Sequence, residues 1–169
     1  MVVFYVAFSP MLQSSDQATG LKVVDERVER VSRDKVHFWV KVANESDRPV
    51  FLIGIQYRNP RPYYLFLEQW RTADGWKAVV PCMDMLPEDV ITLKPGGTMR
   101  LDFLLKVPLS AVCKERNVNL EGRFRYRLEY FDSKKDALTY VKLMDSPDWK
   151  RASALSAVSE SFEISPPKN

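Results

Sequence analysis

Alternating apolar and polar residues along much of this chain predict a succession of β-strands. An early example is KVHFWVKVAN, residues 35–44, in which successive side chains point to opposite faces. One face is apolar and carries Val36, Phe38, Val40 and Val42. The other face is largely polar and carries Lys35, His37, Trp39 and Lys41. We therefore expect the first face to meet a core and the second to meet water.

Further strands are predicted wherever apolar runs lie between turn-forming residues. They cover residues 21–31, 50–55, 63–72, 76–80, 90–93, 99–105, 121–131 and 153–165. The stretch VFLIGI, residues 50–55, is apolar on both faces, as in a strand buried in the middle of a sheet. In residues 121–131 one face carries Phe124, Tyr126, Leu128 and Tyr130. The other face carries Arg123, Arg125, Arg127 and Glu129.

Three segments are less regular. Residues 132–151 combine helical spacing of apolar side chains with β-favouring residues, and we expect a long connection with a helical turn. The stretch 109–117 is either a short helix or a loop. Residues 1–20 begin with an apolar run that is too short to span a bilayer. This N-terminal segment is either the remnant of a signal peptide or a first strand, and both interpretations stay open.

Short strands without intervening amphipathic helices predict an all-β, antiparallel sandwich. The stretches VANESDRPVFL, LKPGGTMRLDFLL, RFRYRLEYF and SESFEI resemble strands of immunoglobulin-like modules in bacterial exported proteins. The resemblance covers roughly residues 36–164. It implies an immunoglobulin-like β-sandwich. The strand pattern gives this domain residues 21–165, with one short helix or long loop insertion, and leaves a frayed tail at 166–169. The resemblance also implies a periplasmic or secreted location, with the cytoplasm as the alternative.

The stretch LEQWRTADGWKAVVPC, residues 67–82, predicts a β-hairpin with two tryptophans. If ADG is a three-residue loop with Gly75 in the left-handed region, Thr72 pairs with Trp76 and Trp70 with Ala78. This register places Trp70, Trp76, Ala78 and Val80 on one face, which we expect to pack against the second sheet. The opposite face then carries Gln69, Arg71 and Lys77.

Charge and cysteine content narrow the possible chemistry. The 25 basic and 22 acidic residues are mixed along the chain, so the formal net charge of +3 predicts no nucleic-acid partner. Cys82 and Cys113 are far apart in sequence and lie in no metal-binding motif, so no metal is expected. In an oxidising compartment they are expected to form a disulfide, and in the cytosol to be two buried thiols. The sequon at Asn44 matters only in a eukaryotic secretory pathway.

Catalytic templates are poorly matched. His37, the only histidine, shares the polar face of its strand with lysines, which favours a surface histidine over a member of a catalytic triad. Asp84, Glu88 and Asp89 lie together, but among turn formers that are typical of a solvated loop. No glycine-rich phosphate loop occurs, and we expect neither a cofactor nor an enzyme.

Two groups of residues are candidates for a binding surface. The first is the row Arg123, Arg125 and Arg127, which would bind an anion or an acidic segment. The favoured alternative is a solvated face whose arginines pair with Glu160 and Glu163 of the last strand. The second group is an aromatic and basic cluster around two prolines, for which packing at the end of the sandwich is the alternative. Its members are Tyr57, Arg58, Arg61, Tyr63 and Tyr64.

The function expected from these features is that of a non-catalytic binding module of the bacterial envelope that contacts another protein. A structural or accessory module of a larger assembly is the alternative. A hydrolase with an unrecognised site ranks lowest.

Overall fold

A computed structural model of the chain describes residues 20–55, 61–62, 65–80, 89–109, 118–143 and 154–167. The strands in these ranges are β1 (Leu21–Ser32), β2 (Lys35–Asn44), β3 (Val50–Ile55), β4 (Arg61–Pro62), β5 (Leu65–Arg71), β6 (Gly75–Val80), β7 (Asp89–Leu93), β8 (Thr98–Lys106), β9 (Gly122–Tyr130), β10 (Leu155–Val158) and β11 (Phe162–Ile164). They are accompanied by the helix α1 (Lys134–Leu143). Residues 1–19 lie outside the described residues, and so do 110–117 and the tail residues 168–169.

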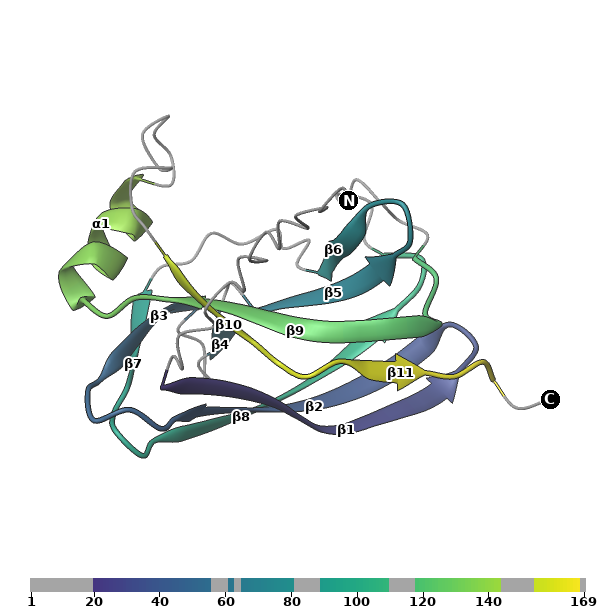
Figure 1. Cartoon of the computed structure of the whole chain (residues 1–169), viewed down its shortest axis with the longest axis horizontal. Helices are drawn as coiled ribbons and strands as arrows, with labels where there is room; N and C mark the ends of the chain where they lie inside the picture. Colours follow the sequence, from purple (N-terminus) through teal and green to yellow (C-terminus); the bar gives the residue numbers. More distant parts are fainter. Residues whose placement is uncertain are drawn as a thin grey trace, which may run out of the picture.

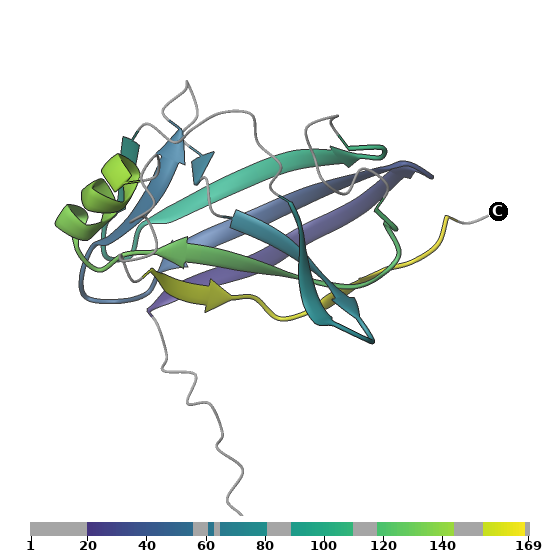
Figure 2. The same ribbon diagram turned by 90° about the horizontal axis from the view of Figure 1, so that it is seen from above.

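The predicted antiparallel β-sandwich is confirmed. One layer is the sheet β1-β2-β8, and the other is the sheet β10-β9-β5-β6, in which β11 also pairs with β9 (Figure 1). Seen from above, the second layer lies across the first (Figure 2). A third sheet, β4-β3-β7, lies at one end of the molecule next to α1. The short helical insertion that the fold prediction included is therefore present.

The core lies between the two layers, and alternation along their central strands creates it. On β2 the predicted apolar residues Val36, Phe38, Val40 and Val42 have no exposed surface. From the opposite layer, β9 contributes Phe124, Tyr126 and Leu128, which are equally buried. The ring of Phe38 stacks on Phe103 of β8 at 5.0 Å and meets the edge of Tyr126 at 6.4 Å. Aromatic rings thus join the layers across the middle of the sandwich.

Residues 144–151 of the expected long connection with a helical turn lie outside the described residues, and residues 134–143 form the helix α1. Ser133 begins it, because its carbonyl accepts from the Ala137 N–H at 3.1 Å. The apolar positions with helical spacing then face the sheet β4-β3-β7: Ala137 and Tyr140 are buried with Ile53, Val90 and Phe131 in a second, smaller cluster. Propensity alone left the region ambiguous, and this tertiary contact explains why the helix forms.

The prediction of a single strand over residues 153–165 is wrong in one respect. The segment forms two strands, β10 and β11, which Ser159–Ser161 separates. The Ser159 hydroxyl accepts from the Tyr126 N–H at 2.9 Å and donates to the Glu160 carbonyl at 2.7 Å. The Ser159 N–H donates to the Tyr126 carbonyl at 3.0 Å. A buried serine that bonds to the main chain in this way interrupts the ladder, since it occupies groups that a continuous strand would use.

Asn44 ends β2 and connects two turns. Its side-chain amide donates to the carbonyls of Arg48 at 2.7 Å and Leu93 at 2.9 Å, and its side-chain oxygen accepts from the Ser46 N–H at 3.1 Å. The Asn44 N–H also donates to the Gly97 carbonyl at 3.0 Å. Asn44 is only 1% exposed, so the sequon that it begins is closed to a glycan in the folded protein.

The β5–β6 hairpin departs from the predicted register. Arg71 pairs with Gly75 and Trp70 pairs with Trp76, so the loop is Thr72–Asp74 rather than ADG. Gly75 does adopt the predicted left-handed conformation, with φ of 72°. The tryptophans still share a face, but a bulge beyond Ala78 places Val80 opposite Leu67 instead.

The tryptophan face points outward, which corrects the expectation that it packs against the second sheet. The pairing of β5 with β9 determines this direction. Leu67 lies opposite Tyr126 and Gln69 lies opposite Phe124, and Tyr126 and Phe124 both belong to the core. Gln69, expected on a wet face, is buried, and its amide donates to the carbonyls of Asn119 and Glu121, each at 2.9 Å. Trp70 takes the opposite orientation and is 46% exposed.

Candidate functional site

The row Arg123, Arg125 and Arg127 lies on the outer face of β9, as the alternation predicts. The neighbouring strand β5 faces this row directly: Glu68 lies opposite Arg125, and Phe66 lies opposite Arg127. On the next strand, Trp76 of β6 pairs with Trp70 of β5. The set defines what we call the arginine–tryptophan face: Phe66, Glu68, Trp70, Trp76, Arg123, Arg125 and Arg127.

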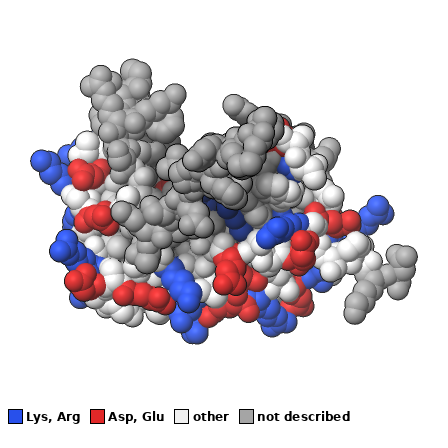
Figure 3. Space-filling view, in the orientation of Figure 1, with Lys and Arg blue, Asp and Glu red and all other residues white. Residues whose placement is uncertain are grey.

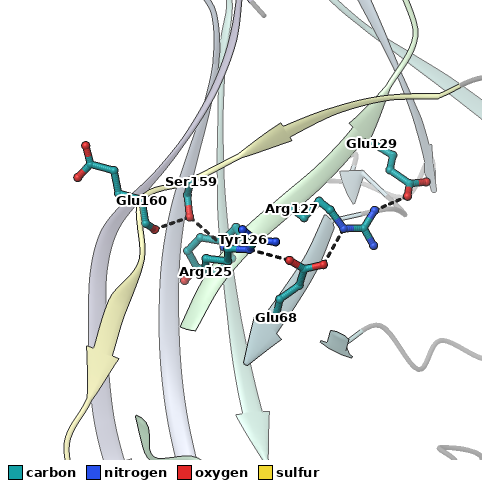
Figure 4. Close-up of polar contacts among 7 residues, drawn as sticks. All are labelled: Glu68, Arg125, Tyr126, Arg127, Glu129, Ser159 and Glu160. Carbon is teal, nitrogen blue, oxygen red and sulfur yellow. Dashed lines mark hydrogen bonds and ion pairs between the residues drawn. The ribbon is translucent and has the colours of Figure 1, made fainter. Parts of the chain in front are cut away.

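Glu68 organises the charges of this face (Figure 4). One carboxylate oxygen accepts from Nε of Arg125 at 2.8 Å, and the other accepts from Nε of Arg127 at 2.7 Å. Although it points away from the core, the Glu68 side chain is only 7% exposed. Charge-assisted bonds of this kind, shielded from water, hold both guanidinium groups in place.

Glu129 completes the network by accepting from Nη1 of Arg127. Burial lowers the pKa of the Arg127 guanidinium, but the hydrogen bonds that it donates to Glu68 and Glu129 outweigh this effect and raise the pKa overall. The arginines therefore do pair with glutamates. The partners, however, are Glu68 and Glu129 and not the expected Glu160 and Glu163, because β5, which the prediction had not paired with β9, lies alongside it.

The third arginine is held differently. Nε of Arg123 donates to the Ser161 hydroxyl at 2.8 Å, and among the described residues it takes part in no ion pair. Arg123 of β9 lies opposite Glu163 of β11, as the prediction of a cross-strand pair requires. Among the described residues, however, the two side chains form no salt bridge. Arg123 is thus the arginine of the face whose charge is least compensated.

Aromatic rings interleave with the arginines. The guanidinium carbon of Arg125 lies 4.3 Å from the ring centroid of Trp76, and that of Arg127 lies 4.2 Å from Phe66. Trp76 in turn meets Trp70 edge to face, with centroids 5.4 Å apart. Such stacking lets arginine cover an aromatic face while it keeps its hydrogen bonds. The alternation of Phe66, Glu68 and Trp70 along β5 was the signal that could have located these partners.

Of the other predicted candidates, the structure describes only a few. Tyr57, Arg58, Tyr63 and Tyr64 lie outside the described residues, as do Cys82, Cys113, Asp84 and Glu88. The main chain of Arg61 belongs to β4 and pairs with Ile55, at the far end near α1. His37 lies on the outer face of the other layer, with Nε2 3.5 Å from a carboxylate oxygen of Asp102.

Inside the sandwich, one acidic group approaches the core. The Tyr126 hydroxyl donates to the Asp25 carboxylate at 3.3 Å. Burial, and secondarily Asp25, raises the pKa of Tyr126, while burial raises the pKa of Asp25 against the lowering effect of the tyrosine hydrogen bond. A cavity of about 440 Å³ opens beside this pair between β1 and the break in the last strand. It holds no arrangement of nucleophile, base and oxyanion donor among the described residues.

The described residues contain no group of three or more His, Cys, Asp or Glu side chains close enough to hold a metal ion. On the face that Figure 3 shows, acidic side chains lie interspersed with basic ones. Within the described ranges, no helix is long and apolar enough to cross a membrane.

Comparisons with known proteins give only distant similarities. No family model and no curated protein matches the chain. Among solved structures, a target of the Northeast Structural Genomics Consortium is similar with a TM-score of 0.37 and 12% identity, over 87% of this chain and 85% of that one. A β-glucosidase involved in saponin metabolism from intestinal bacteria is similar with a TM-score of 0.32 and 12% identity. That match covers 88% of this chain and 16% of the β-glucosidase.

Proposed function

We propose that the chain is a non-catalytic binding module of the bacterial envelope, and that it contacts another protein through the arginine–tryptophan face. The observation that carries the proposal is the position of Trp70. Trp70 is 46% exposed although its side chain is large and apolar, and it packs on Trp76 at the hairpin end of the outer sheet face. Tryptophan and arginine are the residue types that dominate the binding energy of protein interfaces.

The rigidity of this face supports the same proposal. Glu68 fixes Arg125 and Arg127, and these fix the rings of Trp76 and Phe66. Side chains that are already ordered lose little conformational entropy when a partner binds. A face built on strands also presents an extended surface, which suits a protein better than a small molecule that needs a concave site.

Charge compensation argues against the anion site considered for the arginine row. Arg125 and Arg127 share the carboxylate of Glu68, and Arg127 also bonds to Glu129. A phosphate or an acidic polymer would have to displace these internal carboxylates. The arginines of this face therefore serve as supports for the aromatic rings and as hydrogen-bond donors at its rim.

A photo-crosslinking amino acid placed at position 70 in the native host tests the proposal. We expect one discrete protein adduct from position 70 and none from position 138, where Leu138 is an exposed apolar residue on α1, away from this face. In a second experiment the crosslinker is placed at Ala78, on the same face, and Trp70→Ala is expected to abolish the adduct. No adduct at either position, with a folded protein, would instead favour a structural or accessory module.

The envelope location has its own test. If Cys82 and Cys113 are bonded in an oxidising compartment, thiol titration of denatured, unreduced protein from the native host gives no free thiol. Two free thiols per chain would contradict the periplasmic or secreted location and leave the cytoplasm as the compartment.

A further inference from the structure

The outer face of the β1-β2-β8 layer carries a second, different surface. The register places there the residues that alternate with the core residues of the three strands. We call it the basic face. Its basic members are Lys22, Arg27, Lys35, Lys41, Arg100 and Lys106. Its acidic members are Glu29 and Asp102, with Glu26 added by the bulge in β1.

The ion pairs on this face involve its arginines and His37 and leave the charges of its lysines uncompensated. Arg27 bonds to Glu29, Arg100 approaches Glu26 at 3.2 Å, and His37 approaches Asp102 at 3.5 Å. Among the described residues, the four lysines enter no ion pair; they are Lys22, Lys35, Lys41 and Lys106. This is the reverse of the arginine–tryptophan face, where a buried carboxylate neutralises two arginines.

Like charges also lie directly opposite each other here. Lys35 pairs with Lys106 and Lys41 pairs with Arg100 in the ladder between β2 and β8. Such pairs destabilise a sheet in the free protein. Near the Lys35–Lys106 pair, the Asp34 carboxylate in the turn partly compensates the positive charge. This carboxylate accepts from the Ser32 hydroxyl at 2.6 Å. The remaining repulsion would be relieved by negative charge from outside.

The centre of the basic face carries the outward-facing aromatic and apolar side chains, with Glu29 and Asp102 beside them in the register. Trp39 stacks on His37 with ring centroids 3.8 Å apart, and the guanidinium carbon of Arg27 lies 4.7 Å from the Trp39 ring. Next to His37 in the register lies Leu104, which is 54% exposed. Aromatic and apolar side chains between charged ends have the layout of a protein-binding surface with a charged rim.

We infer that the basic face binds an acidic segment of a second protein partner, on the opposite side of the sandwich from the arginine–tryptophan face. The two like-charged pairs lie six positions apart along β2, which corresponds to about 20 Å in an extended strand. The segment that fits has two acidic groups at about that separation and apolar residues between them, which contact Trp39 and Leu104. The module would then bridge two proteins.

A titration of ¹⁵N-labelled protein with a synthetic peptide that has glutamates at both ends of a short apolar stretch, spaced about 20 Å apart when extended, tests this inference by NMR. We expect chemical-shift changes confined to the outer-face residues of β1, β2 and β8. Raising the salt concentration should weaken the binding, because exposed charges are screened. The variant Lys41→Glu/Lys106→Glu should bind at least tenfold more weakly.

The design separates binding from folding. Lys41→Glu and Lys106→Glu each turn a like-charged cross-strand pair into an opposite-charged one, so the melting temperature should stay equal or rise. The control, Lys77→Glu/Lys135→Glu, makes the same change of charge on β6 and α1 and should bind as the unmodified protein does.

Three results would overturn the inference. They are shift changes outside the basic face, equal loss of binding in the control, and no binding at millimolar peptide. Binding to phosphatidylglycerol vesicles without binding to the peptide would assign the face to a lipid surface and also refute a protein segment. The crosslinks from position 70 concern the opposite layer, so each proposal can fail alone.

Discussion

Glu68 and Arg125 lie directly opposite each other on neighbouring strands, and their side chains meet at 2.8 Å on the outer surface of the sandwich. The second oxygen of the same carboxylate bonds to Arg127, two positions further along β9. One acidic side chain therefore sets the positions of two arginines and, through them, of two aromatic rings. The following predictions begin from this arrangement.

Glu68→Gln should destabilise the fold by about 3 kcal/mol, because removing the shared carboxylate leaves two partly shielded arginines without their partner. The side chains of Arg125 and Arg127 are each about a quarter exposed. The expected loss of stability is therefore at the lower end of the range for breaking a buried ion pair. Urea unfolding followed by far-UV circular dichroism measures the change. The matched control is Glu129→Gln, which removes a bond to one arginine only and should cost about 1 kcal/mol or less. Equal costs for both variants would contradict the central position of Glu68.

Trp70→Ala should change the free energy of unfolding by less than about 1 kcal/mol, since the ring points outward and packs on Trp76 rather than on the core. The contrasting variant is Phe38→Ala, which opens a cavity between the layers and should cost about 4 kcal/mol. Thermal unfolding of both variants gives the comparison. A loss at Trp70 as large as that at Phe38 would mean that the tryptophan supports the fold, and it would weaken the case for a binding role.

Asn44→Ala should destabilise the protein by about 3 kcal/mol, because the buried Leu93 carbonyl loses its donor and the Arg48 carbonyl keeps only the Ser46 hydroxyl. Asn44→Asp should cost at least as much, since a carboxylate presents oxygen to those carbonyls in place of the N–H groups. Chemical denaturation at neutral pH measures both. A neutral Asn44→Asp variant would show that the amide donors contribute little.

Asp25→Asn should stabilise the protein at pH 7 and have a smaller effect as the pH falls. Burial raises the pKa of Asp25 in the folded state, so between its unfolded and folded pKa values the folded protein binds more protons. The ionised carboxylate therefore costs stability above the folded pKa, and this cost disappears below the unfolded pKa. Asparagine keeps an acceptor for the Tyr126 hydroxyl without the charge. Urea midpoints at pH 7 and pH 3.5 test the sign, and a gain that grows toward low pH would refute it.

Much of the fold could be predicted because alternation reports directly which side chains face the core. The strands at residues 35–44 and 50–55 have the predicted bounds, and all four apolar positions of β9 are buried. The helix after β9 was underestimated, because its apolar face is explained only by contact with β3 and β7, which lie far away in sequence. Local patterns contain no information on such partners.

The candidate site was predicted in part. The arginine row followed from the period of β9, but its carboxylate partner depended on which strand lies next to β9. The hairpin that contains Trp70 and Trp76 is apolar enough on one face to suggest burial, and local sequence does not distinguish a core from an exposed apolar surface. Only the pairing of Leu67 and Gln69 with core residues of β9 settles the direction.

The break at Ser159 also affects how copies of this protein behave toward one another. Strands β10 and β11 form an edge of their layer, and Leu155–Val158 and Phe162–Ile164 are each too short for a long run of main-chain pairing. Ser159 further directs its hydroxyl and N–H toward Tyr126, inside the molecule. A second copy approaching this edge thus finds no continuous ladder to extend, which protects a protein rich in strands against fibrous aggregation.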